Sequence, residues 1–100
     1  MVAVGLFIRV EVKPDKVSEF EAKLKTVVDI VRAEGLAAAW FGLRTGPTSF
    51  AIFDVFANDE DRQAHLAANF EALRSIGAEL FVGEPVVDHI DVSAAMLRGE

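Results

Sequence analysis

The chain contains no cysteine and no tyrosine among its 100 residues, and it has only three prolines and one tryptophan. Without cysteine it can form no disulfide, no thiolate metal site and no thiol nucleophile. No apolar run approaches the roughly 20 residues of a membrane-spanning helix, and no basic segment precedes the apolar N-terminus as in a secretory signal. We therefore expect a cytoplasmic protein without a membrane partner.

Positive charge is also scarce, because 10 lysines and arginines stand against 16 acidic residues, which gives a net charge of -6. A chain of this charge is repelled by a phosphate backbone, so we expect no nucleic-acid partner. Hydrophobic residues make up 52% of the chain and the mean hydropathy is +0.31. That is more apolar than most monomers of this length, and it predicts that part of the surface meets a second chain.

The first third of the chain predicts a strand followed by a helix. Residues 3–12 alternate between two faces, which is typical of a strand. Pro14 and Asp15 then supply a break and a helix cap, and apolar residues recur at steps of three and four from Val17 onward. Gly35 is expected to end this helix in the left-handed conformation.

The middle of the chain predicts an antiparallel hairpin, formed by residues 36–44 and 49–57 around a turn at residues 45–48. Its second run is apolar at both parities except for Asp54, so we expect both faces of that strand to be buried. A second helix is expected to follow an N-cap at Asn58.

The residue pattern of this second helix is compatible with a bend or an interruption near Asn69 or Gly77. Residues 86–92 read as a last strand, and residues 93–97 as a short terminal helix.

The order of elements is β-α-β-β-α-β, within one domain that spans residues 1–100 and ends in a short extension over residues 93–100. Its simplest solution is a ferredoxin-like α+β fold, with a four-stranded antiparallel sheet and two helices on one face. The other face would expose large apolar side chains in a monomer. We therefore expect a homodimer that forms through this open face.

Five segments of the chain form a recognisable set: Glu34-Gly35-Leu36, Trp40-Phe41, Gly46-Pro47, Phe50-Ala51-Ile52-Phe53-Asp54-Val55-Phe56 and Arg62-Gln63-Ala64-His65-Leu66. With these segments the chain resembles the antibiotic biosynthesis monooxygenase family, especially its small stand-alone members described as candidate quinol monooxygenases. The resemblance covers nearly the whole chain and is most specific between Phe53 and Leu66.

The resemblance implies a dimeric α+β barrel with a pocket between the sheet and the helices of each subunit. It also implies oxidation of polyaromatic phenols, anthrones or quinols by molecular oxygen without metal or flavin. Haem-degrading relatives carry an asparagine on the first strand and a histidine further along the second helix, and this chain has neither. We expect no cofactor and no metal site, with haem and flavin disfavoured.

His65 is the leading candidate for a catalytic residue, because an imidazole can take the proton of a phenolic substrate near neutral pH. Asp54 would orient it, since a carboxylate buried in an apolar strand requires a partner. The alternative for both is a structural contact that ties helix to sheet. Arg62 and Asn69 share the helix face of His65 and would extend a polar strip along the pocket edge.

An aromatic wall for a flat substrate is predicted from four side chains, for which core packing or a dimer interface is the alternative. These side chains are Trp40, Phe53, Phe7 and Phe56. Arg44 could hold a developing oxyanion, although a solvated strand end or an intersubunit salt bridge is the simpler interpretation for it and for Arg9. His89 is interpreted as peripheral.

These residues predict a cofactor-independent monooxygenase that oxidises a small aromatic quinol, phenol or anthrone-like molecule with molecular oxygen. Two alternatives remain open from the sequence. One is a non-catalytic dimeric protein that binds a small apolar metabolite in the same pocket, and the other is an isomerase or lyase that uses the same histidine.

Overall fold

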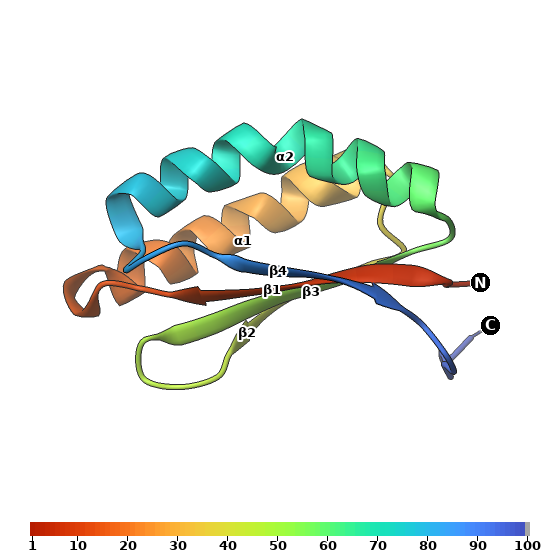
Figure 1. The fold of residues 1–100 in the computed structure, drawn as a ribbon, viewed down its shortest axis with the longest axis horizontal. Helices are drawn as coiled ribbons and strands as arrows, with labels where there is room; N and C mark the ends of the chain where they lie inside the picture. Colours follow the sequence, from red (N-terminus) through yellow and green to blue (C-terminus); the bar gives the residue numbers. More distant parts are fainter. Residues whose placement is uncertain (100) are drawn as a thin grey trace.

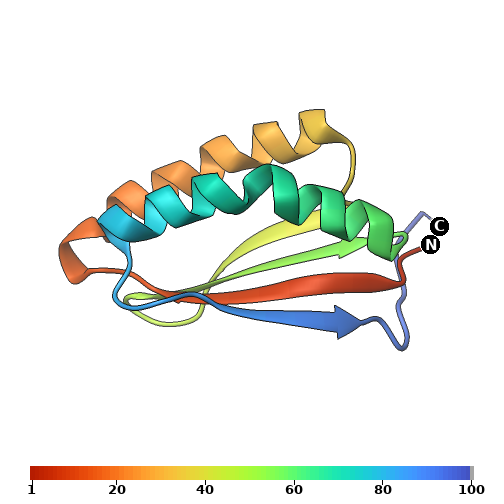
Figure 2. The same ribbon diagram turned by 45° about the horizontal axis from the view of Figure 1, so that its top comes forward.

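The computed structural model describes residues 1–99, and it is a sheet covered on one face by two helices (Figure 1). The second view shows both helices on the same side of the sheet (Figure 2). The elements, in chain order, are β1 (Val4–Glu11), the 3-10 turn η1 (Pro14–Lys16), α1 (Val17–Glu34), β2 (Ala39–Arg44), β3 (Ser49–Phe56), α2 (Asp59–Leu80) and β4 (Val86–Asp91).

The four strands form one antiparallel sheet in the order β2-β3-β1-β4. Because the two edge strands follow the two helices, each helix returns the chain across the same face. This is the ferredoxin-like α+β arrangement that the order of elements predicted, and the prediction is confirmed.

The register of the strands decides which side chains share a face. Asp54 lies opposite Leu6 of β1 and opposite Trp40 of β2. Directly opposed residues point to the same side of a sheet, so these three form one row beneath the helices. The next row points away from the helices. It contains Phe53 of β3, with Phe7 of β1 opposite it on one side and Phe41 of β2 on the other.

Aromatic rings fill one end of the core between sheet and helices. Phe20 of α1 packs edge-to-face against Phe50 and Phe81, with ring centroids 5.1 and 5.4 Å apart. The buried core cluster consists of Leu6, Ile8, Val10, Val12, Phe20, Phe50, Phe56, Leu80 and Phe81. These side chains come from both layers, so burial of their apolar surface holds the helices on the sheet.

The predicted helix ends are partly confirmed. Gly35 has φ 72°, the left-handed conformation expected after α1, and the Asn58 side chain accepts a hydrogen bond of 2.8 Å from the Asp61 amide. The expected cap at Asp15 is wrong, because this residue lies in η1 and α1 begins after Lys16 without a side-chain cap. α2 continues as one helix through Asn69 and Gly77.

The short helix expected over residues 93–97 is also wrong, because this segment has no helical structure. Five residues cannot meet the cost of nucleating a helix unless they pack against something. Met96 is 73% exposed, which leaves its side chain with little packing to contribute. No helix within residues 1–99 is long and apolar enough to cross a membrane.

Candidate functional site

A cavity of about 70 Å³ lies between the helices and the sheet. Its lining is mostly apolar, and the residues that form it are Leu6, Ile8, Phe20, Lys23, Leu24, Val27, Val31, Trp40, Ile52, Asp54, His65, Leu66, Asn69, Phe70, Ala72, Leu73 and Ile76. Lys23 of α1 and Phe70 of α2 are also exposed to solvent. The cavity therefore meets solvent between the two helices.

His65 lies between two carboxylates at the polar part of this cavity. Its Nδ1 is 2.5 Å from Oε1 of Glu34, and its Nε2 is 3.1 Å from Oδ2 of Asp54. The side chains of His65 and Asp54 are 7% and 1% exposed, and that of Glu34 is 15% exposed. The predicted pairing of Asp54 with His65 is thus present as a close contact, and a second carboxylate completes the cluster.

Three elements bring this cluster together. Asp54 points from the middle of β3 toward the helices, His65 comes from the second turn of α2, and Glu34 is the last residue of α1. The imidazole also packs against the ring of Phe56, with centroids 5.2 Å apart. The cluster therefore joins the ends of both helices to the centre of the sheet.

Asn69 stands one turn after His65 on α2 and fixes the position of Glu34. Its Nδ2 donates to Oε2 of Glu34 at 2.9 Å and to the backbone carbonyl of His65 at 2.8 Å. Both hydrogens of the amide are used in these bonds. Asn69 therefore lies at the cavity edge as predicted, and it orients the carboxylate that holds the histidine.

The two carboxylates favour the doubly protonated form of His65. An ionised carboxylate can only accept hydrogen bonds, so both ring nitrogens must carry a proton to meet Glu34 and Asp54 favourably. Burial lowers the pKa of His65, but the close contacts and negative charges of Asp54 and Glu34 outweigh it and raise the pKa above its ordinary value. The surroundings of His65 therefore favour an imidazolium between two carboxylates.

The carboxylate of Asp54 is less well satisfied than that of Glu34. The distance from Nε2 to Oδ2 is that of an ion pair, yet the ring N–H is not directed closely enough at this oxygen to make a hydrogen bond. Among residues 1–99, neither oxygen of Asp54 has a hydrogen-bond partner. A buried acceptor in this state is unusual, and here it also lines the cavity.

Glu34 lies in a segment that resembles the family, but the sequence alone assigns it no role. One signal could have identified it. A carboxylate in the last turn of a helix faces the negative end of the helix dipole, and it is stable there only with a positive partner. That partner is His65, which is 31 residues further along the chain.

The aromatic wall predicted for the pocket is only partly present. Trp40 lines the cavity, whereas Phe56 is fully buried beside the imidazole and does not line it. Phe7 and Phe53 lie on the opposite face of the sheet, where their ring centroids are 6.4 Å apart. Because Phe53 is adjacent to Asp54 in a strand, the two side chains cannot enter the same cavity.

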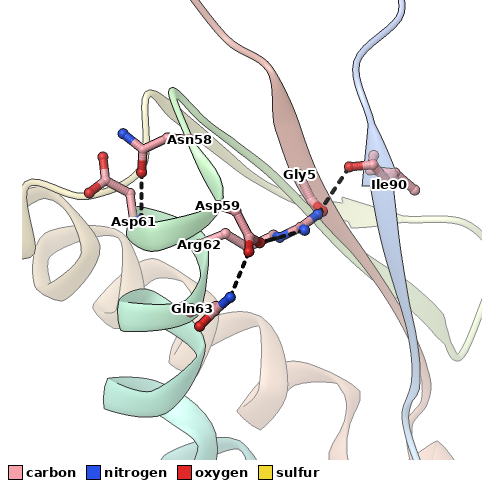
Figure 3. A network of polar contacts seen from close by, with 7 residues as sticks. All are labelled: Gly5, Asn58, Asp59, Asp61, Arg62, Gln63 and Ile90. Atoms are coloured by element: carbon pink, nitrogen blue, oxygen red, sulfur yellow. Dashed lines mark hydrogen bonds and ion pairs between the residues drawn. The ribbon is translucent and has the colours of Figure 1, made fainter.

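Arg62 does not line the cavity either, because its guanidinium forms hydrogen bonds between the start of α2 and the sheet. Nη1 donates to the backbone carbonyls of Gly5 and Ile90, at 3.1 and 3.2 Å (Figure 3). Nε and Nη2 bind Oδ1 of Asp59 at 3.0 and 2.6 Å. Arg62 therefore ties the first turn of α2 to β1 and β4, which fixes the register of the helix that carries His65.

Arg44 likewise has a structural position. Its guanidinium donates to the carbonyls of Gly46 and Pro47, lies 3.7 Å from Glu21 and stands over the ring of Phe50 at 5.5 Å. It closes the hairpin between β2 and β3 and does not line the cavity. Within residues 1–99, no group of three or more His, Cys, Asp or Glu side chains is arranged to hold a metal ion.

Comparison with known proteins connects this arrangement to a family. The model of the antibiotic biosynthesis monooxygenase family matches residues 3–72. A crystal structure of a protein of unknown function from Nitrosomonas europaea is 35% identical, with a TM-score of 0.89, and the match covers 100% of this chain and 98% of that one. The search of curated proteins found no match.

Two more distant structures share the fold. A candidate antibiotic biosynthesis monooxygenase from Caulobacter crescentus is 21% identical, with a TM-score of 0.79 and coverage of 93% of this chain and 92% of that one. Another, from Nitrosomonas europaea, is 17% identical, with a TM-score of 0.79 and coverage of 91% and 90%. The family match extends from β1 into α2 as far as Ala72, which is more than two thirds of the chain, and on this ground the chain belongs to the antibiotic biosynthesis monooxygenase family.

Proposed function

We propose that this protein is a cofactor-independent monooxygenase that oxidises a small hydroxylated aromatic compound with molecular oxygen. The observation that carries the proposal is a mostly apolar cavity into which a buried carboxylate and an imidazolium, Asp54 and His65, are both directed. An apolar site with a few convergent polar groups of perturbed pKa is typical of a small-molecule site. Family membership adds the reaction class.

The size of the cavity favours a substrate with one ring. A cavity of about 150 Å³ holds benzene in another protein, and the cavity here measures about 70 Å³. A single ring would need modest movement of the side chains at the opening, such as Phe70. A three-ring anthrone would need a separation of α1 from α2, so hydroquinones and simple phenols are the better candidates.

The chemistry requires the substrate to lose a proton while its ring loses electrons to oxygen. With 1,4-hydroquinone, one oxygen atom of O2 enters the ring and the other leaves as water, so the products are hydroxybenzoquinone and H2O. The carboxylate of Asp54 would receive the hydroxyl proton, and the imidazolium of His65 would stabilise negative charge on the substrate oxygen. Trp40 would supply an aromatic surface beside the ring.

Oxygen consumption tests this proposal. We expect uptake with one-ring hydroquinones to exceed uptake with anthrones, and His65→Ala to reduce the rate about 100-fold or more, the size of the loss when a group that stabilises charge in the transition state is removed. His89→Ala is the matched control, because His89 is exposed on β4, and it should retain the wild-type rate. Circular dichroism would confirm that each variant is folded.

One result would contradict the proposed monooxygenase activity. If no substrate of the panel supports uptake while a hydroquinone still quenches the fluorescence of the single tryptophan, Trp40, the protein is a binding protein for small apolar molecules.

We also propose a homodimer that forms through the open face of the sheet. This face carries Phe41 and Leu43 of β2, which are 49% and 38% exposed, and Val86 of β4, which is 48% exposed. The stacked rings of Phe41 and Phe53, with centroids 6.1 Å apart, present an apolar surface that burial would stabilise.

Sedimentation should therefore give about twice the chain mass of 10.9 kDa. Phe41→Glu should shift the particle toward the monomer, because it would place a charge in the buried interface. Ile30→Glu is the control, since Ile30 is 52% exposed but lies on α1, in the helical layer. A wild-type protein with the mass of a single chain would contradict the dimer.

A further inference from the structure

The carboxylate of Asp54 has a property that the proposed reaction does not by itself require. It is 1% exposed, it faces the cavity, and neither of its oxygens has a hydrogen-bond partner among residues 1–99. A buried anion with free lone pairs is a strong acceptor that awaits a donor. A ligand that enters the cavity is in a position to provide it.

The donors next to Asp54 are already engaged. The Nδ1 proton of His65 is directed to Glu34, and both amide hydrogens of Asn69 are used by Glu34 and by the backbone carbonyl of His65. The imidazolium Nε2 is in ion-pair contact with Asp54 itself. This part of the cavity therefore offers an incoming ligand an acceptor and little else.

The net charge of the cluster also favours a neutral ligand that donates a hydrogen bond. Asp54 and Glu34 each contribute one negative charge and His65 one positive charge, so the cluster as a whole carries one negative charge. Of the other groups that line the cavity, Lys23 is exposed at its opening and Trp40 is neutral. An anionic ligand is therefore repelled from the buried end, while a neutral hydroxyl donor is attracted.

We propose that Asp54 makes the cavity selective for the reduced, hydroxyl-bearing form of its ligand and against the oxidised form that carries only carbonyl groups. The identity of the two forms as hydroquinone and quinone rests on the proposed function. A hydroquinone donates O–H to the carboxylate, whereas a quinone of nearly the same shape brings only oxygen lone pairs toward it. A buried group that loses its partner discriminates strongly against the ligand that lacks it.

Equilibrium binding under argon tests the selectivity without turnover. Isothermal titration with 1,4-hydroquinone and 1,4-benzoquinone should show that the wild-type protein prefers the hydroquinone by about 10- to 100-fold, the contribution of a hydrogen bond to a charged group. The chain has no cysteine that the quinone could alkylate. Phenol and fluorobenzene form a second, unreactive pair of matched shape, and phenol should bind more tightly by a similar factor.

Asp54→Asn assigns the preference to this residue. The amide can donate N–H to a quinone carbonyl, so the variant should bind benzoquinone more tightly than wild type does, and the preference for hydroquinone should fall to nearly 1 or reverse. Contributions from Trp40 and Lys23 are the same in both proteins and cancel in this comparison. The phenol–fluorobenzene comparison in the wild type keeps the test decisive if the variant folds poorly.

The outcomes separate this inference from the proposed function. Equal wild-type affinities for phenol and fluorobenzene, or an unchanged preference in a folded Asp54→Asn protein, would overturn the selectivity even if the protein consumes oxygen. Strong selectivity without oxygen consumption on any substrate would support the role of Asp54 in selectivity, and it would contradict the proposed monooxygenase activity.

Discussion

Replacement of His65 by leucine is expected to lower the free energy of unfolding by about 3–5 kcal/mol at pH 7, the usual effect of removing one partner from a buried ion pair. Leucine fills a similar volume but leaves Asp54, which is 1% exposed, without the cation that compensates its charge. Glu34 is 15% exposed and can turn toward water, so most of the loss arises at Asp54. Urea denaturation followed by circular dichroism measures the difference.

A comparison with a double variant identifies the cause of this loss. The double variant Asp54→Leu/His65→Leu should recover part of it, since an apolar pair of similar volume often replaces a buried ion pair without loss. His89→Leu, at an exposed site, should change stability by no more than about 0.5 kcal/mol.

A His65→Leu protein as stable as wild type would contradict this account. It would mean that the buried carboxylate of Asp54 does not need the imidazolium as its partner, which contradicts the ion pair between the two side chains.

The sequence predicted the fold because its periodicities are local. Alternation over residues 3–12, three- and four-residue steps from Val17, and turn residues at 45–48 each depend on near neighbours in the chain. The order of these elements then leaves few arrangements, and the observed strand order is the simplest of them. The prediction of the terminal helix was wrong because five residues cannot meet the cost of nucleating a helix without extensive packing.

The site was harder to predict because its members meet only in the folded chain. Asp54 and His65 could be paired from the sequence, since one lone carboxylate in an apolar strand needs a partner. Glu34 could not be placed there by spacing, because the contact joins the end of α1 to α2 across 31 residues. Arg62 was predicted to lie beside His65 at the cavity edge, yet its guanidinium donates hydrogen bonds to the backbone carbonyls of Gly5 and Ile90.

The error with Phe53 was of another kind. Its position next to Asp54 already determines that the two side chains point to opposite faces of a strand. A consistent use of strand parity would have assigned Phe7 and Phe53 to the open face, and Leu6, Trp40 and Asp54 to the face under the helices. Of the aromatic residues predicted for the pocket, Trp40 thus lies at the cavity, whereas Phe7 and Phe53 lie at the proposed interface.

The raised pKa of His65 makes stability depend on pH in a defined direction. In the unfolded chain this histidine titrates near its ordinary pKa of about 6.5, and in the folded protein its pKa is higher because of Asp54 and Glu34. Between the two pKa values the folded state holds one more proton than the unfolded state. The stability from this group is therefore fully present below the unfolded pKa and is lost as the pH rises through the folded pKa.

We expect the free energy of unfolding to fall from near neutral pH into the alkaline range, with a slope of at most about 1.4 kcal/mol per pH unit, the limit for one proton. The lowered pKa values of Glu11 and Asp59 act in the acid range, where stability is lost as the pH falls. The two windows do not overlap. Urea denaturation at intervals from pH 6 to pH 10 measures the alkaline loss.

The His65→Leu protein is the control that isolates this effect, because it retains every other titrating group. Its stability should lack the alkaline loss attributed to His65, so the difference between the two proteins should narrow as the pH rises. NMR titration of the His65 ring in a His89→Asn background should give a midpoint above the ordinary histidine value. Parallel pH profiles for wild type and His65→Leu would show that the imidazole is not held as a cation.

The same titration bears on the proposed chemistry. Loss of the His65 proton leaves Asp54 and Glu34 as two uncompensated carboxylates, 3.1 and 2.5 Å from a neutral ring. The buried end of the cavity would then repel a developing phenolate more strongly, and the reaction would lose the cation that stabilises it. Oxygen uptake should therefore decline over the pH range in which stability falls, because both depend on one proton shared between two carboxylates.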